Sequence, residues 1–235
     1  MNILLIAGHG AGDPGAVATV NGKSYKEAEL TRQVVENLKR NLEEYAAVTV
    51  YPTERNAYSD YQVGKLGTYA KLSKFDYVLE IHFNAFSRDG GNGKVKGTEA
   101  YVTTSEAGVS VENAILQRMA ALGYTNRGVK RKNWGVISAV KKAGVSACLL
   151  EVCFVDDGDD MALYEMTKLK TAEAIALGIA EGFGLRKEKA QMTAEEAIVA
   201  LAGKGIINTP DYWMAHYGDL RFLDELLIKM AEYIT

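Results

Sequence analysis

The chain has 235 residues, of which 48% are hydrophobic and 24% charged, and its formal net charge at pH 7 is −3. This composition is ordinary for a globular protein, and a chain of this length can bury most of its surface without disulfides. The lack of a basic excess argues against nucleic acid as a partner, and no segment is long and apolar enough to predict stable membrane insertion.

The chain opens on an apolar run, residues 2–7, that predicts a buried strand. The run is too short for the core of a signal peptide and has no basic leader before it. We therefore expect synthesis in the cytoplasm without a signal peptide. A substrate outside the cell would then require release by another system, such as a membrane lesion of the holin type.

Strand-like and helix-like segments alternate over residues 1–185. Apolar runs predict further strands at 47–51, 77–83, 97–103 and 146–155. Apolar residues spaced by three or four predict helices at about 25–45, 62–74, 109–122 and 161–183. The alternation predicts an α/β fold, with a mostly parallel sheet and helices on both faces. In such sheets, ligands gather at the carboxyl ends of the strands.

Both cysteines, Cys148 and Cys153, fall in the predicted strand 146–155. Their odd spacing places them on opposite faces of a regular strand. We therefore expect two buried thiols and no disulfide.

The composition changes at the charged run 186–189, which predicts a linker over residues 186–190. Thr193 to Glu196 forms a capping-box pattern that begins a helix. A short helix is expected from Thr209, and a last one from Asp219 to Tyr233. Residues 191–235 are thus predicted to be a small all-helical unit with a targeting, docking or dimer role. For Tyr212, Trp213 and Tyr217, packing in the core of this unit or docking it on the α/β part is favoured over a sugar-stacking surface.

Four polar residues stand out in the α/β part. His9 follows the first strand, Glu27 begins the first long helix, and His82 and Glu151 lie late in two apolar strands. The carboxyl ends of parallel strands meet at one edge of a sheet, so these side chains could converge. Two imidazoles and a carboxylate are a frequent catalytic zinc set, and a further carboxylate can act as general base.

Each of these residues also has an ordinary structural interpretation. His9 could be a loop histidine without a ligand, and His82 a hydrogen-bonded core histidine. On spacing alone, Glu27 is better explained as the end of a capping box that begins at Ser24. Glu151 must be paired or functional, because an unpaired carboxylate in an apolar strand is costly. No spacing rule joins the four residues.

The same residues lie in motifs that resemble the amidase_3 family, the zinc N-acetylmuramoyl-L-alanine amidases of bacteria and their phages. The resemblance covers about the first 185 residues. Its motifs are Gly8-His9-Gly10 with Asp13 to Ala16, Glu27 followed by Leu30, Ile81 to Ala85, Gly97 to Tyr101, Arg127 to Lys130, and Leu150 to Phe154. Together they occur in the family's order, each on the expected element.

The resemblance implies a site and a reaction. His9, Glu27 and His82 would hold one Zn²⁺ per chain, and Glu151 would be the general base and then the general acid. Asn84 and Arg127 are candidates for positioning the substrate. The family fold implies a twisted sheet of about six strands. The reaction implied is hydrolysis of the amide bond between N-acetylmuramic acid and L-alanine in bacterial peptidoglycan.

The sequence departs from the family pattern at two places. No arginine occurs in residues 62–74, and Val155-Asp156-Asp157 stands where the family often has asparagine and proline. Neither departure touches the proposed zinc ligands, so both concern substrate details.

Two other functions are compatible with the residues, a zinc peptidase on the same scaffold and a wall-binding module without activity. The retained set of four residues argues against the second. With no signal peptide expected, a phage or prophage endolysin is favoured over a secreted autolysin. A homodimer through the C-terminal helices is a further hypothesis.

Overall fold

The computed structural model describes residues 1–86, 94–187, 193–219 and 222–234, and these fall into two compact units, Met1–Arg186 and Lys187–Thr235. Most of the predicted linker lies outside the described residues. Within them, no helix combines the length and the apolar character needed to cross a membrane.

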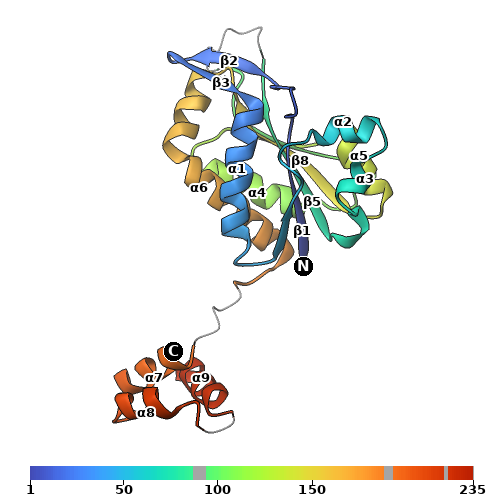
Figure 1. Cartoon of the computed structure of the whole chain (residues 1–235). Coiled ribbons are helices and arrows are strands. Elements are labelled where there is room, and N and C mark those ends of the chain that lie inside the picture. The colour runs from blue at the N-terminus through green and yellow to red at the C-terminus, as the bar shows by residue number, and fades with distance from the viewer. Residues whose placement is uncertain (87–93, 188–192, 220–221, 235) are drawn as a thin grey trace. The chain divides into compact units, whose positions relative to one another are not determined.

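The first unit is an α/β layered structure (Figure 1). Its strands are β1 (Asn2–Ala7), β2 (Val17–Val20), β3 (Lys23–Lys26), β4 (Ala47–Val50), β5 (Tyr77–Asn84), β6 (Thr98–Val102), β7 (Asn126–Arg131) and β8 (Ser146–Phe154). Its helices are α1 (Glu27–Leu42), α2 (Ala57–Gln62), α3 (Leu66–Tyr69), a 3-10 turn (Leu72–Lys74), α4 (Ser110–Ala121), α5 (Gly135–Lys142) and α6 (Gly158–Phe183).

Six strands form one sheet in the order β4-β1-β5-β8-β6-β7. All neighbours are parallel except β6 and β8, which are antiparallel. The predicted fold class, a mostly parallel six-stranded sheet with helices on both faces, is therefore confirmed. The strand β7 had not been predicted, because its residues are mostly polar and it lies at an edge of the sheet.

The two faces of the sheet are covered differently. Helices α1, α4 and α6 pack on one face and enclose the larger apolar core, which contains Leu38, Ile115 and Ile175. The shorter α2, α3 and α5 lie on the other face (Figure 1), around a smaller core that includes Val136 and Val140. These shorter helices leave part of this face of the sheet uncovered, and polar groups lie there.

Local chemistry explains where the observed elements differ from the predicted ones. The continuous helix predicted over 62–74 does not form. An unpredicted helix, α2, ends at Gln62, just before Gly64 with φ 71°, and the predicted range contains only α3 and the 3-10 turn. Residues 25–26, predicted as helical, pair with β2 in a hairpin instead. Helix α5, which was not predicted, contributes buried apolar side chains to the smaller core.

The two cysteines are free and buried, as expected. They share one apolar cluster and do not lie on opposite faces. The pairing of β5 with β8 shifts register between His82 and Asn84, so strict alternation fails just before Cys153.

The second unit contains α7 (Ala194–Gly203), α8 (Pro210–His216) and α9 (Leu223–Ile234). Helix α7 begins with the predicted capping box between Thr193 and Glu196. The three helices have their own core, against which Trp213 and Tyr217 pack, whereas Tyr212 is 57% exposed and stacks on His216.

A buried carboxylate anchors α2. Asp60 is 4% exposed and accepts hydrogen bonds from Tyr51 Oη at 2.8 Å and Arg55 Nε at 2.7 Å. The Arg55 guanidinium also lies over the ring of Tyr69, 3.5 Å from its centroid. The hydrogen bonds from Arg55 hold the pKa of Asp60 below its usual range.

We expect Asp60→Asn to lower the free energy of unfolding by about 2 kcal/mol at neutral pH, the usual size for hydrogen bonds to a charged group. The folded-state pKa of Asp60 is depressed, so its contribution is complete above the unfolded pKa of about 4 and is lost as the pH falls through the folded value. Urea unfolding of both proteins between pH 6 and pH 3 should therefore show a shrinking difference. Glu54→Gln, at an exposed position nearby, is the control. A pH-independent difference would contradict this account.

Candidate active site

Charged side chains gather on the less covered face of the sheet. In the register of β5, β8 and β6, His82 lies opposite Glu151, and Glu151 lies opposite Glu99. Directly paired residues point to the same face, so these three side chains are neighbours. Glu80 precedes His82 by two residues on β5 and shares that face.

The carboxylate of Glu27 connects the first loop, α1 and β5. Its Oε1 lies 3.0 Å from His82 Nδ1 and accepts the backbone N–H of Phe83 at 2.9 Å. Its Oε2 lies 3.0 Å from His9 Nε2 and accepts the N–H of Ala16 at 2.9 Å. The capping-box interpretation is wrong, since Ser24 lies in β3 and α1 has no side-chain cap.

His9 is held from its other side. Its Nδ1 lies 2.8 Å from Asp13 Oδ2, which also accepts a hydrogen bond from Asn56 Nδ2 at 3.0 Å. Arg32 donates to the carbonyl oxygens of Gly8 at 3.2 Å and His9 at 3.1 Å. His9 itself has φ 61°, a left-handed backbone that few non-glycine residues adopt and that often marks functional sites.

These residues could hold a metal ion. Three side chains, those of His9, Glu27 and His82, each offer one possible ligand atom. These three atoms all lie within 4.8 Å of one another. His82 Nε2 is buried, 3.2 Å from Glu80 Oε1, and makes no hydrogen bond within the described structure. The structure thus brings together the three residues that the sequence predicted as ligands.

The electrostatics of the cluster favour an ionised Glu27 and positive charge next to it. Burial alone would raise the pKa of Glu27, but hydrogen bonds with His82 and His9 outweigh it and hold this pKa well below its ordinary value. Burial opposes protonation of both histidines, yet contacts with Glu27, and for His82 also with Glu80, raise their pKa values. A cluster of this kind offers carboxylates to a cation.

Glu151 differs from the other carboxylates. Its Oε2 is buried and has no hydrogen-bond partner among the described residues. Burial raises the pKa of Glu151 to about 7, while the neighbouring charges act in both directions. A carboxyl group with a pKa near neutrality can both accept and donate a proton, which is what general acid–base catalysis requires.

Asn84 and Arg127 converge on a residue that the sequence analysis missed. Asn84 Nδ2 donates to Glu99 Oε1 at 2.9 Å, and Arg127 Nε donates to Glu99 Oε2 at 2.6 Å. Lys130 and Tyr101 also bind this carboxylate, which is 1% exposed. The odd placement of a glutamate inside the apolar β6 was the available signal.

A groove of about 540 Å³ contains His9, His82 and Glu151. Three exposed aromatic residues line it as well, Tyr58 and Tyr61 from α2 and Trp134 at the start of α5. The sequence analysis missed them, because neither α2 with its tyrosines nor α5 had been predicted. The groove therefore combines charged groups on the sheet with aromatic side chains on the covering helices.

Two glycines allow the first loop to approach the cluster. A Cβ at Gly8 would lie 2.4 Å from His82 Cε1. A Cβ at Gly15, where φ is 65°, would lie 2.6 Å from Glu27 Oε2. Real Cβ atoms do not come so close to other heavy atoms, so the glycine-rich loop is a steric condition for this site.

The fold is that of a known family of enzymes. Residues 3–181 match the family Amidase_3, described as N-acetylmuramoyl-L-alanine amidase. The chain therefore belongs to this family, and the protein is an N-acetylmuramoyl-L-alanine amidase that acts on peptidoglycan. A search of curated proteins finds no match.

Solved structures agree with this assignment. The catalytic domain of CwlV, an amidase from Bacillus (Paenibacillus) polymyxa var. colistinus, is 25% identical with a TM-score of 0.63, covering 79% of this chain and 99% of that one. A putative amidase from Neisseria meningitidis is 26% identical with a TM-score of 0.58, covering 79% and 97%. The catalytic domain of the CD27L endolysin, which targets Clostridia difficile, is 18% identical with a TM-score of 0.60, covering 77% and 97%, and shows the fold alone.

The close approach of Gly8 to His82 can be tested by one methyl group. We expect Gly8→Ala to lower the free energy of unfolding by about 1–3 kcal/mol, the usual cost of overpacking, because the imidazole must move. Gly108→Ala, in open space, is the matched control. Urea unfolding of the three proteins measures the effect, and equal stability of the two variants would contradict it.

Proposed function

We propose that the protein hydrolyses the amide bond between the lactyl group of N-acetylmuramic acid and L-alanine with one zinc ion held by His9, Glu27 and His82. One observation carries this proposal. Three side chains from a loop, a helix and a strand bring ligand atoms within 4.8 Å of one another, beside the buried carboxyl of Glu151.

The residues fit zinc by their chemistry. Two imidazoles and one carboxylate are a common set for catalytic zinc, which keeps a fourth position open. The contact between His9 Nδ1 and Asp13 is the kind of carboxylate–histidine pair that orients a metal ligand and fixes its tautomer. Glu80 adds a further carboxylate next to His82.

Bound zinc supplies Lewis acidity toward the scissile carbonyl and lowers the pKa of water at the open position to about 7. Glu151 accepts a proton from the attacking water as the new C–O bond forms. It then donates this proton to the L-alanine nitrogen as the C–N bond breaks, so a free amine leaves. The side chain can do both because burial places its pKa near neutrality.

Asn84 and Arg127 are proposed to act as positioning residues through Glu99. Both side chains bind this carboxylate, and Glu99 lies opposite Glu151 in the sheet. The cationic partners lower the pKa of Glu99, against the effect of burial, and so keep a fixed negative charge beside the general base. That charge helps to keep the pKa of Glu151 high.

The origin of the protein and its assembly stay predictions. Phage genes beside its gene would support an endolysin released through a membrane lesion, whereas ordinary division genes alone would count against it. Sedimentation of the full chain tests the predicted homodimer through the C-terminal helices. Binding of residues 191–235 to isolated walls tests a targeting role.

We expect Glu151→Gln to retain about one zinc per chain and to lose activity on muropeptides by a factor of about 10²–10⁴, the usual contribution of a general acid–base group. Metal analysis and release of new N-terminal alanine measure the two properties. Loss of zinc would place Glu151 among the ligands instead. A new amino terminus other than alanine in the wild-type reaction would indicate a peptidase.

The pH dependence follows from the same residue. Glu151 must be ionised to accept a proton, so activity should fall as the pH decreases through its pKa. This acidic limb should lie near or below pH 7, because burial raises the pKa of Glu151 to about 7 and a cation bound nearby favours the ionised carboxylate. Glu99→Gln removes a neighbouring negative charge and should move the limb to lower pH.

We expect Asp13→Asn to weaken zinc binding by about 10–100-fold, the usual effect of removing the partner of a metal-bound histidine. Competition with a chromogenic chelator measures the affinity without reference to catalysis. Glu54→Gln, at an exposed position outside the cluster, should bind zinc like the wild type. Unchanged affinity in Asp13→Asn would remove Asp13 from the site.

A further inference from the structure

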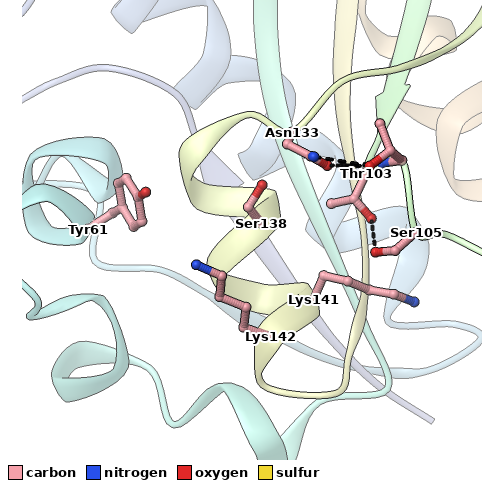
Figure 2. A pocket seen from close by; sticks show the side chains of 8 residues that line it. Tyr61, Thr103, Ser105, Asn133, Ser138, Lys141 and Lys142 are labelled. Carbon is pink, nitrogen blue, oxygen red and sulfur yellow. Dashed lines mark hydrogen bonds between the residues drawn. The ribbon is translucent and has the colours of Figure 1, made fainter.

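Figure 2 shows a second pocket, of about 570 Å³, which shares lining residues with the groove that contains Glu151. It is formed by α2, α5 and the turn that follows β6. Tyr61 and Asn133 line both the groove and this pocket. The two cavities are therefore contiguous, and an extended molecule held at Glu151 can continue past these two residues into the second pocket.

The lining of this pocket is polar and contains no carboxylate. Hydroxyl groups come from Tyr61, Thr103, Ser105 and Ser138. Ser138 Oγ is buried and has no hydrogen-bond partner within the described residues. Since a buried hydroxyl without a partner costs free energy, this group is available to a ligand that accepts a hydrogen bond.

Two adjacent lysines end α5, and they differ in their partners. Lys141 Nζ donates to the buried carboxylate of Glu106 at 2.9 Å, which neutralises it. The Nζ of Lys142 has no ion-pair or hydrogen-bond partner in the described part of the chain. Figure 2 shows Lys142 extending toward the side on which Tyr61 lies, while Lys141 extends to the opposite side. The pocket therefore has one uncompensated positive charge.

In the substrate of the proposed function, only the part on the peptide side of the scissile amide bond carries free carboxylates. The carboxyl group of the muramic acid is consumed in the scissile amide, and its sugar neighbours are neutral. The stem peptide, in contrast, carries free carboxylates. A pocket with an unpaired ammonium group, hydroxyl donors and no acidic residue complements the peptide and not the glycan.

We propose that this pocket is the subsite for the stem peptide, in which Lys142 pairs with a free carboxylate and Ser138 donates a hydrogen bond to it. The proposal rests on the proposed function and gives the bound substrate a direction. The peptide passes between Tyr61 and Asn133, and the glycan lies on the side of Tyr58 and His9. Specificity for acidic over amidated stem peptides follows from the charge of Lys142.

Binding of the free peptide tests the subsite without catalysis. Calorimetry compares an acidic stem tripeptide with the same peptide amidated at its side-chain and terminal carboxylates. The proteins are the zinc-loaded wild type, Lys142→Gln, Lys142→Arg and Ser138→Ala. Lys170→Gln is the matched control, because Lys170 is also exposed and helical but lies on α6, on the other face of the sheet.

We expect Lys142→Gln to weaken binding of the acidic peptide about tenfold, a typical value for one charge-assisted hydrogen bond. Its affinity for the amidated peptide should change far less. Lys142→Arg should restore most of the binding, Ser138→Ala should weaken it, and Lys170→Gln should match the wild type. In hydrolysis of muropeptides, KM for the acidic substrate should rise in Lys142→Gln more than kcat falls.

The outcomes separate the two proposals. If the wild type cleaves muropeptides but Lys142→Gln binds and turns over acidic and amidated forms like the wild type, the subsite is wrong and the amidase mechanism stands. If the acidic peptide binds through Lys142 but no new N-terminal alanine appears, the subsite stands and the mechanism fails. If the wild type does not bind the peptide at all, the subsite is overturned.

Discussion

The site depends on the contact of one buried carboxylate with two histidines. Glu27 touches His9 with one oxygen and His82 with the other, and both oxygens also accept backbone N–H groups. These bonds hold together a loop, the first turn of α1 and the end of β5. A buried carboxylate needs such partners to remain ionised, so the same contacts that satisfy Glu27 also set the spacing of the proposed metal ligands.

The uneven covering of the sheet explains where the chemistry lies. Long helices pack against the larger apolar core on one face, whereas α2, α3 and α5 surround a smaller core on the other. Beyond the apolar side chains, the same face carries four charged or polar side chains, those of Glu80, His82, Glu99 and Glu151. The covering helices bring aromatic and hydroxyl groups to the rim of the same face. The proposed catalytic groups and the aromatic and hydroxyl groups that line the two cavities thus come from different layers of one fold.

Most strands of the sheet, its long helices and the four central residues could be predicted from the sequence, but β7, α2, α5 and much of what surrounds the four residues could not. Glu27 fitted a capping box as well as a ligand, and only the three-dimensional position of His82 decides between these. The steric role of Gly8 could not be predicted, because its contact with His82 joins segments far apart in the chain. Glu99 had a local signal, a glutamate inside an apolar strand, but its partners come from other strands. Lys142 has no local pattern, since its role depends on which charges are neutralised nearby.

The edge strand β7 has a consequence for the protein at high concentration. An unpaired strand edge can template pairing with another chain. Here the edge carries Arg127, Lys130 and Arg131 in a stretch of six residues. Two copies that approached edge to edge would bring these like charges together. These positive residues, of which Arg127 and Lys130 bind Glu99, therefore also disfavour growth of the sheet into aggregates.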